Sequence, residues 1–462
     1  MTDLAQLSAE ALLTLYRRGA ATPVDALQAV TERIARLNPA CNAFAVLNPR
    51  ALAAAGESAQ RWRAGRPIGA LDGVPCTVKD LIDIAGFPTR RGSRTTSAEP
   101  ADQDAPLVVG LKSAGAVIVG KTTTTEFGWK SPGDCPLHGI TRNPWNPAYS
   151  TGGSSSGAGA AAAAGFGPLH VGTDAGGSVR IPAAWCGVVG LKPSFGRVPQ
   201  WPLGAFAPVA VAGPMTRTVR DAALMLGAMA RHDWRDPYSL PDAGRDWLDG
   251  IEAGVGGMRV AVLRTPGFDA PVDADGVAAV EQAAQILADA GAELEEVDAG
   301  LPDTGALFVT LWSAALRLVV SATPEDRRPW LDAGLMALAA APDPPGTAML
   351  QAAAQQVQTA HAMAKLHQAY DLVLCPCVPG PPPLADAPTV DPVHALLHRW
   401  APWTFAFNLS RQPAISVPLG RSALGLPRSV QIAAALYRDD LVLRAARVLE
   451  HAVPIPLAGD PA

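Results

Sequence analysis

The sequence predicts an α/β fold with one sheet covered by helices on both faces. From about residue 70, short β-like runs alternate with helical stretches, which is the pattern of α/β proteins. The strand candidates are apolar along most of their length, as expected for strands buried on both sides. They lie at residues 74–78, 116–120, 170–174, 187–192, 258–263, 371–376, 414–419 and 429–436.

Two amphipathic helices are expected before this alternation begins. Ser8 and Gly19 bracket the segment AEALLTLYRR, and Thr22-Pro23 opens VDALQAVTERIARLN with a capping residue followed by a proline. We expect residues 1–60 to pack on the domain as helices, and their outer faces are compatible with a homodimer contact.

Helices are also predicted between and after the strands. GAGAAAAAG (157–165) and VAAVEQAAQILADAG (277–291) read as helices, and residues 305–370 look helical throughout. Residues 376–392 form a proline-rich irregular stretch. Because no repeat or linker divides the chain, we predict one domain that carries residues 305–370 as a helical insertion.

Composition excludes several function classes. The chain has 462 residues and a formal net charge of −5, so it offers no basic surface for nucleic acid and no polybasic membrane patch. Asp3 and Glu10 stand where a secretion signal would be basic, and no apolar run reaches the roughly 18 to 20 residues that span a bilayer. The six cysteines lack CxxC spacing, and Cys375 and Cys377 are expected to be buried small side chains. A reducing cytoplasm is the predicted location.

Two short motifs match known expressions but lack the required context. GAVIVGKT (115–122) fits the Walker A expression, yet its central residues belong inside a strand and no helix follows Lys121. GSSSG (153–157) fits the nucleophile elbow around Ser155, yet turn-rich RNPWNPAYST precedes it in place of a strand. A histidine-dependent elbow hydrolase stays an alternative, and its candidate histidines are His361, His367, His394, His398 and His451.

The segment GTDAGGSVR (172–180) presents Ser178 after two glycines, the usual setting of an exposed nucleophile. A serine hydroxyl is a poor nucleophile until a base takes its proton. Lys79 is a candidate base because it ends the apolar stretch GVPCTVK, where burial favours the neutral amine. The alternative is a strand-end lysine paired with Asp80 or Asp83.

A glycine-serine run, STGGSSSGAGAAAAAG (150–165), leads directly into a small-residue helix. Such a run is more often a linker. A linker would not continue into an alanine helix and then a strand that ends in GTDAGG. Small residues here therefore indicate close backbone packing.

With these segments, the chain resembles the amidase signature family over nearly its whole length. The resemblance is carried, in order, by LDGVPCTVKDLIDIAG, GAVIVGKTTTTEFGW, TRNPWNPAYSTGGSSSGAGAAAAAG, VGTDAGGSVRIPAAWCGVVGLKPSFGRVP, GPMTRTV and NLSRQPAISVPLG. It implies a single domain, residues 1–462, around a central mixed and twisted sheet. One departure is Ala158, where a second glycine pair often follows the serines; we expect its methyl group to alter packing but not chemistry.

The resemblance implies a Ser-Ser-Lys triad. Ser178 corresponds to the nucleophile, Lys79 to the base, and Ser154 to a bridging serine that follows a cis peptide bond and relays the proton. A single oxyanion donor can lower the barrier by about 3 to 4 kcal/mol. The oxyanion hole corresponds to the backbone amides of Ala175, Gly176, Gly177 and Ser178.

Four further positions correspond to supporting residues. Asp174 and Arg180 match positions that tie down the nucleophile loop. The Ser155 hydroxyl is expected to steady the loop around the bridging serine, and Thr151 is the fourth candidate.

The implied reaction is acyl transfer to water without a metal or organic cofactor. Amides, anilides and carbamates are the candidate substrates, with esterase or urethanase as a side activity, and residues 305–370 would shape the substrate entrance. Aromatic residues between the motifs are candidates for an apolar pocket, although each also fits a place in the core. They are Phe127, Trp129, Trp201, Phe206 and Trp312.

A second hypothesis comes from the glutaminase (A) subunit of glutamine-dependent tRNA amidotransferases, which shares this signature and works inside a complex. Residues 376–392 and 305–340 would then form an interface, whereas a stand-alone hydrolase would use them as a substrate lid. Because no feature calls for a tRNA-bound partner, we favour a stand-alone small-molecule hydrolase, monomeric or homodimeric, with no nucleic acid or membrane partner.

Overall fold

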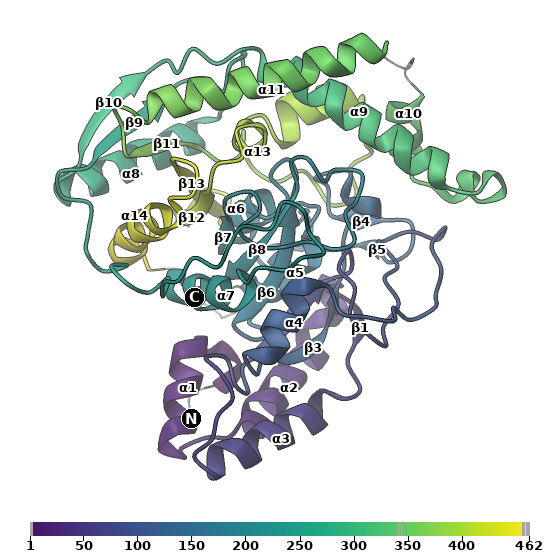
Figure 1. Ribbon diagram of the computed structural model, residues 1–462, viewed down its shortest axis with the longest axis vertical. Helices are drawn as coiled ribbons and strands as arrows, with labels where there is room; N and C mark the ends of the chain where they lie inside the picture. The colour runs from purple at the N-terminus through teal and green to yellow at the C-terminus, as the bar shows by residue number, and fades with distance from the viewer. Residues whose placement is uncertain (1–2, 341, 343–344, 455–457, 459–462) are drawn as a thin grey trace.

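The computed structural model describes residues 3–340, 342, 345–454 and 458, and a large mixed sheet forms its centre (Figure 1). The eleven described strands follow the order β1-β3-β2-β6-β8-β7-β12-β13-β11-β9-β10. Neighbours are parallel within β3-β2-β6 and within β11-β9-β10, and antiparallel elsewhere. The strands are β1 (Phe44–Leu47), β2 (Pro75–Lys79), β3 (Val117–Thr122), β6 (Leu169–Asp174), β7 (Val189–Lys192), β8 (Val211–Thr216), β9 (Arg259–Leu263), β10 (Glu293–Val297), β11 (Leu372–Pro376), β12 (Ala414–Arg421) and β13 (Pro427–Ala434).

All eight predicted strands are present, and they correspond to β2, β3, β6, β7, β9, β11, β12 and β13. The Walker-like motif lies in β3, which is buried along its whole length. Within that strand the Lys121 ammonium lies 2.7 Å from the Asp80 carboxylate. These residues therefore form a structural strand and not a phosphate-binding loop.

Three strands of the central sheet were not predicted. β8 contains Gly213 and Pro214, residues that weaken a strand pattern. β10 carries three glutamates and lies at one edge of the sheet, where charge is tolerated. β1 has only four residues and forms the opposite edge, and β4 (Asp134–Cys135) and β5 (Gly139–Ile140) make a separate short hairpin. Short or charged edge strands escape a search for apolar runs.

Helices cover both faces of the sheet, as predicted. One face packs against α1 (Ala9–Arg18), α4 (Pro106–Ser113), α7 (Val219–Met229), α8 (Ala274–Asp289) and α14 (Asp439–Ala452). The other face packs against α2 (Pro23–Cys41), α3 (Ala51–Arg63), α5 (Ser156–Ala163), α6 (Arg180–Cys186), α11 (Gly346–Leu366) and α13 (Ala406–Leu409). Cys375 and Cys377 are buried, as expected.

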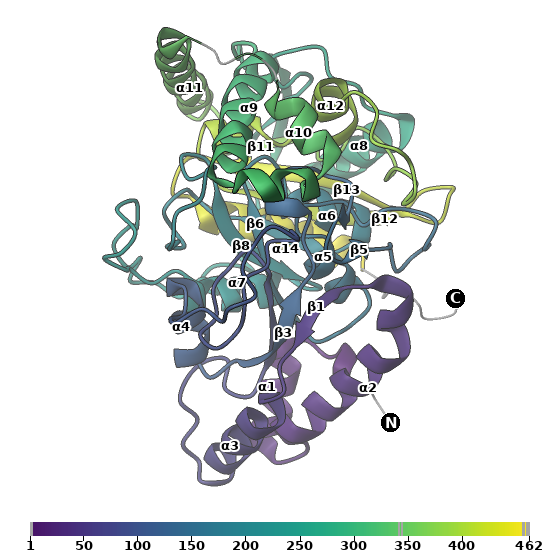
Figure 2. The same cartoon turned by 90° about the vertical axis from the view of Figure 1, so that its right-hand side faces the viewer.

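The N-terminal helices begin and end at the predicted caps. The Ser8 hydroxyl accepts a hydrogen bond from the Ala11 amide, and Gly19 adopts a left-handed φ of 67° after α1. Thr22 and Asp25 form a reciprocal capping box at the start of α2. Figure 2 shows α1, α2 and α3 together at one end of the molecule.

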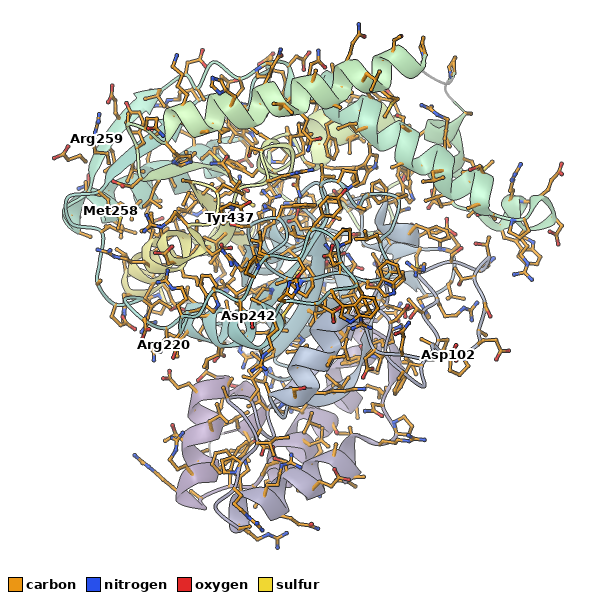
Figure 3. All side chains as sticks on the ribbon, viewed as in Figure 1. Asp102, Arg220, Asp242, Met258, Arg259 and Tyr437 are labelled. Carbon is orange, nitrogen blue, oxygen red and sulfur yellow. The ribbon has the colours of Figure 1, made fainter. Side chains whose placement is uncertain are left out.

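Arg220 on α7 ties these helices to the domain. Its guanidinium lies 2.7 Å from Glu10 on α1 and 3.0 Å from Glu252 (Figure 3). The Ala9 amide, at the first turn of α1, donates to the buried Asp221 carboxylate. Residues 1–60 therefore belong to the same body as the sheet.

Residues 304–366 form the predicted helical segment. It contains α9 (Thr304–Ala322), a 3₁₀ turn (Glu325–Trp330), α10 (Ala333–Ala339) and α11, which lie together in Figure 1. The expectation that no apolar run could span a bilayer is wrong for α9, which is long and apolar enough by length and composition. In the structure α9 packs on α10 and α11 and buries Phe308, Trp312 and Leu316.

The proline-rich segment after β11 is irregular, as predicted. The chain continues from it through α12 (Pro392–His394) and a π-helical turn (Ala395–Trp400) before reaching α13. The π-helical turn joins α9 and α10 in one apolar cluster through Leu396 and Trp400. This cluster lies beside the loops that carry the site.

Candidate active site

Lys79 ends β2, and its side chain is fully buried. Its Nζ lies 2.8 Å from Ser154 Oγ, 2.9 Å from Ser155 Oγ and 2.8 Å from Thr173 Oγ1. β2 runs parallel to β6, so the carboxyl ends of both strands bring Lys79 and Thr173 to the same edge. Three hydroxyl groups therefore surround one amine.

Four of the six lysines are buried, and Lys79 differs from the others in its partners. Lys121 pairs with Asp80, and Lys130 pairs with two aspartates. Neither Asp80 nor Asp83 lies within ion-pair distance of Lys79, so the strand-end ion pair considered from the sequence is not formed. Burial lowers the pKa of Lys79 well below its ordinary value, although the negative charge of Asp174 opposes this.

The serine loop approaches Lys79 through close backbone packing. The Gly153–Ser154 peptide bond is cis, as the resemblance implied. α5 starts directly after this loop, and a Cβ at Gly157 would clash with the Ala43 carbonyl and the Thr123 amide. Ala158 is fully buried inside the apolar cluster around α5. The small residues of this segment therefore serve packing, as predicted.

The nucleophile loop joins β6 to α6 and is held by one carboxylate. Asp174 Oδ1 accepts a hydrogen bond from the Gly177 amide at 2.8 Å, and Oδ2 accepts one from the Val179 amide at 3.2 Å. The Ser155 amide donates to the Ser178 carbonyl at 3.2 Å. Both serine-bearing loops are thus connected through main-chain groups.

Asp174 and Arg180 form a fully buried ion pair at 2.9 Å. Burial raises the pKa of the Asp174 carboxyl, but the Arg180 guanidinium outweighs this and holds the pKa below its ordinary range. Arg180 also donates to the Thr404 carbonyl and to the side chains of Asn408 and Gln431. A charged network of this kind fixes the loop beneath Ser178.

The backbone amides of the loop are not equivalent. Gly177 uses its amide for Asp174 and has a φ of 125°, which favours glycine. In the described chain, no hydrogen bond is made by the amides of Ala175, Gly176 and Ser178. These three amides are therefore free to bind an external acceptor.

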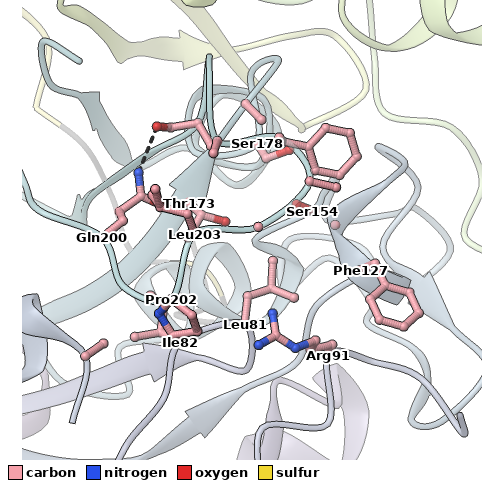
Figure 4. A pocket seen from close by; sticks show the side chains of 18 of the residues that line it. Leu81, Ile82, Arg91, Phe127, Ser154, Thr173, Ser178, Gln200, Pro202 and Leu203 are labelled. Atoms are coloured by element: carbon pink, nitrogen blue, oxygen red, sulfur yellow. Dashed lines mark hydrogen bonds between the residues drawn. The ribbon is translucent and has the colours of Figure 1, made fainter. Parts of the chain in front are cut away.

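Ser154 and Ser178 line the same cavity, which has a volume of about 140 Å³ (Figure 4). Its walls are mostly apolar, and Ser178 is 8% exposed within it. Thr173 connects this cavity to the buried Lys79 amine. The cavity is lined mainly by Leu81, Ile82, Leu107, Phe127, Trp201, Pro202, Leu203 and Phe206.

The five predicted aromatic residues divide into two groups. Phe127, Trp201 and Phe206 line the cavity with the two serines. Trp129 and Trp312 are buried behind it, where the Trp312 indole donates to the Trp129 carbonyl and stacks on Phe206 at 4.1 Å between ring centroids. The second pair therefore supports the wall and does not form its surface.

Comparison with known proteins identifies the family. The family model described as Amidase matches residues 25–443. This chain belongs to the amidase signature family. It is therefore a hydrolase of carbon–nitrogen bonds in amides.

Relatives and a solved structure cover the amidase almost completely. An acylamidase of Rhodococcus erythropolis is 35% identical, over 98% of this chain and 96% of its own. The glutaminase (A) subunit of the glutamyl-tRNA(Gln) amidotransferase of Geobacter metallireducens is 32% identical, over 97% of this chain and 98% of its own. The structure of a bacterial aryl acylamidase superposes with a TM-score of 0.89 at 27% identity, covering 99% of both chains.

None of the candidate histidines of the elbow alternative lines the cavity of the amidase. His367 contacts the Tyr370 carbonyl, and His451 contacts Glu252 at the surface. Ser155, the would-be elbow nucleophile, instead accepts from Lys79 and donates to the Thr173 carbonyl. No group of three His, Cys, Asp or Glu side chains in the described chain is arranged to hold a metal ion.

Two residues near the site were missed by sequence reasoning, and one supporting candidate lies apart. Thr173 is the third hydroxyl at Lys79, and Asn408 donates to both the carboxylate and the carbonyl of Asp174. Thr173 directly precedes Asp174 in a quoted motif, and Asn408 begins another, so both motifs held a signal. Thr151 bonds the Thr141 and Gly152 carbonyls and makes no contact with Lys79.

Proposed function

We propose that this amidase cleaves a small amide or anilide through an acyl-enzyme on Ser178, with Lys79 as the base and Ser154 as the proton relay. The observation that carries this proposal is the fully buried Lys79 amine, whose hydrogen-bond partners are three hydroxyl groups. A lysine that served only as a structural charge would have a carboxylate partner, as Lys121 has.

The hydroxyl arrangement supports a neutral amine that accepts a proton from Ser154. A neutral lysine has two N–H donors and one lone pair, so one of its three neighbours must donate to it. The Ser155 hydroxyl hydrogen is directed to the Thr173 carbonyl at 3.2 Å, which leaves Ser155 as an acceptor from Lys79. Ser154, which lines the cavity beside Ser178, is the donor that connects the base to the nucleophile.

In the proposed acylation step, Ser178 Oγ attacks the amide carbonyl carbon. The Ser178 proton passes to Ser154 Oγ while Ser154 gives its proton to Lys79 Nζ. The carbonyl oxygen becomes an oxyanion, for which the unused amides of Ala175, Gly176 and Ser178 are the donors. We leave Gly177 out of this oxyanion hole because its amide donates to Asp174.

Collapse of the tetrahedral intermediate breaks the C–N bond. Lys79 returns its proton through Ser154 to the leaving nitrogen, which departs as an amine or ammonia. Water then attacks the Ser178 ester by the same relay and releases the acid. Asp174, Arg180 and Ser155 position these groups and take no proton themselves.

The cavity supports an aryl or short alkyl substrate. An apolar cavity of about 150 Å³ in a protein core can hold one benzene molecule, and this cavity has a similar volume. Phe127 and Phe206 offer flat apolar contacts to such a group. Carbamates and aryl esters that fit the same space are proposed as further substrates.

We propose that the protein acts on these small molecules in the cytoplasm as a monomer or homodimer, without nucleic acid, membrane or cofactor. Support comes from the net charge of −5 and from six buried free cysteines. We assign the entrance of the cavity to residues 305–370, because Val319 of α9 contributes to its lining.

The second candidate is the glutaminase subunit of an amidotransferase, since a full-length relative bears that name. The first experiment is therefore run on the purified chain alone, with an aryl anilide, a short aliphatic amide, an aryl carbamate and glutamine. Release of aryl amine that disappears in Ser178→Ala supports the hydrolase. Ammonia from glutamine alone, at a low rate, supports the amidotransferase component instead.

Ser156→Ala is the matched control for Ser178→Ala and Ser154→Ala. Ser156 is buried in the same region, but its hydroxyl has no hydrogen-bond partner among the described residues. We expect this variant to keep its activity, whereas the other two lose it. Equal loss in all three variants would mean that the loop had been disturbed and would contradict the assigned roles.

A further inference from the structure

Arg91 is a cation in the wall of an otherwise apolar cavity. It is partly buried and lines the cavity together with Ser154 and Ser178. In Figure 4 its guanidinium extends toward Leu81, on the opposite side of the cavity from Ser178. It therefore faces the part of a substrate that is remote from the reacting carbonyl.

The Arg91 guanidinium has no protein partner. Within the part of the chain that the structure describes, it makes no ion pair and donates no hydrogen bond. Its neighbour Arg90 donates to Thr96, and the nearby Asp80 carboxylate is taken by Lys121. A guanidinium has five donors, so those of Arg91 are available to a ligand.

The main chain aims this side chain by holding Arg91 in a rarely used conformation. Its φ is 53°, in the left-handed region that favours glycine. The Arg91 amide donates to the Asp80 carbonyl at 3.0 Å, and its carbonyl accepts from the Phe127 amide at 2.8 Å. Both contacts connect it to segments that adjoin the catalytic groups. A non-glycine residue held in this way at a cavity points to a functional side chain.

The apolar surroundings increase the effect of this charge. Leu81, Ile82 and Phe127 line the same cavity, and ion pairs in a poorly solvated site are stronger than in water. An arginine fork matches the two oxygens of a carboxylate in a planar, bidentate arrangement. An uncharged aryl or alkyl substrate would leave Arg91 unpaired.

We propose that Arg91 binds a carboxylate at the end of the substrate remote from the C–N bond, so that the preferred substrates are amides of small carboxylate-bearing molecules. This rests on the proposed function, in which Ser178 attacks the amide. It narrows the substrate class from neutral aryl or alkyl amides to anionic ones.

Two matched substrate pairs test the proposal on either side of the scissile bond. On the acyl side, the mono-4-nitroanilide of glutaric acid is compared with the 4-nitroanilide of pentanoic acid. On the amine side, 4-acetamidobenzoate is compared with 4-methylacetanilide. We expect kcat/KM for the acid to exceed that for its neutral partner at least tenfold in one pair, mainly through KM.

Arg91→Gln is expected to abolish this preference, and Arg91→Lys to restore part of it, since a lysine keeps the charge without the fork. Arg94→Gln is the control, because Arg94 is an exposed arginine three residues away that does not line the cavity. It should keep the wild-type ratio of acid to neutral turnover. An unchanged ratio in Arg91→Gln, or no preference for the acid in either pair, would overturn the proposal.

A binding measurement separates this proposal from the catalytic one. The glutaric mono-4-nitroanilide is titrated into Ser178→Ala and into the double variant with Arg91→Gln, and heat of binding is recorded. At least tenfold weaker binding in the double variant supports the Arg91 site even if no substrate is cleaved. Equal binding overturns it. Turnover that persists in Ser178→Ala would instead reject the proposed nucleophile.

Discussion

The Asp174 carboxylate lies 2.8 Å from the Gly177 amide and 2.9 Å from the Arg180 guanidinium. One side chain therefore fixes the turn of the nucleophile loop and neutralises the buried arginine beneath it. This also removes the Gly177 amide from the set of free donors that faces the cavity. The loop can hold Ala175, Gly176 and Ser178 amides in a common orientation because their neighbour is occupied.

Asp174→Asn should impair both stability and catalysis. The amide removes the negative charge and leaves Arg180 as a buried, uncompensated cation, which typically costs about 3–5 kcal/mol. Urea unfolding should show this loss, and kcat for a good anilide should fall because the loop amides lose their anchor. Asp102→Asn, at an exposed position labelled in Figure 3, is the control and should leave both unchanged. Wild-type kcat in a stable Asp174→Asn protein would contradict the positioning role.

Lys79→Met should abolish activity while leaving the fold intact. Loss of the base is expected to lower kcat by about 10²- to 10⁴-fold. Because the buried amine is desolvated, its removal should change the free energy of unfolding by no more than about 2 kcal/mol. The control is Lys112→Met, which removes an exposed lysine paired with Asp104.

The pH dependence gives an independent check on Lys79. Burial lowers its pKa below the ordinary value of 10.5, and the base works only when it is neutral. The wild-type kcat/KM should therefore fall as pH decreases through the lowered pKa. Since the unfolded lysine binds a proton more readily than the folded one, stability contributed by this group should rise with pH up to about 10.5. Activity that is flat with pH would exclude Lys79 as the base.

The sequence reveals the ends of the strands better than the contacts between them. GVPCTVK and GTDAGG were both found as strand ends, and their parallel pairing in β2 and β6 is what brings Lys79 to Thr173. Nothing local to Thr173 indicates that its hydroxyl faces an amine 94 positions earlier. Asn408, which lies 234 positions from Asp174, is hidden in the same way.

Burial was equally hard to predict for charged residues. A lysine at a strand end reads as solvent-exposed, but Lys79, Lys121 and Lys192 are all almost fully buried. Their partners differ, and the partners decide which one is a base. The aromatic residues show the converse, since Trp129 and Trp312 fit a pocket by composition but pack behind it because α9 covers them. Arg91 is visible only once the cavity is known.

Glu126 should make stability fall as pH rises across a window below neutrality. Burial raises its pKa to about 7 from 4.5, against hydrogen bonds from the Ser93 hydroxyl and the Asp332 amide. Between these values the folded state binds more protons than the unfolded state, so the free energy of unfolding decreases with rising pH, by on the order of 3 kcal/mol. Glu126→Gln should flatten this slope in urea titrations at pH 4.5 to 7. The slope should persist in the exposed control Glu99→Gln.

Gly176→Ala should damage the oxyanion loop by steric contact alone. A Cβ at this position would come within 2.5 Å of the Phe308 ring, which is buried between Trp312 and Phe405. Because this aromatic stack cannot retreat, the loop must move, and even a small displacement of its amides should lower kcat by about 10²-fold. KM should change less, since the apolar walls of the cavity stay in place.

Gly56→Ala is the matched control for this substitution. Gly56 lies inside α3, and a Cβ there would meet no atom within 4 Å. Alanine in a helix interior is expected to add about 0.5–1 kcal/mol of stability, with no effect on turnover. If Gly176→Ala kept the wild-type kcat while Gly56→Ala behaved as described, the Gly176 amide would not be an oxyanion donor, and the proposed hole would shrink to Ala175 and Ser178.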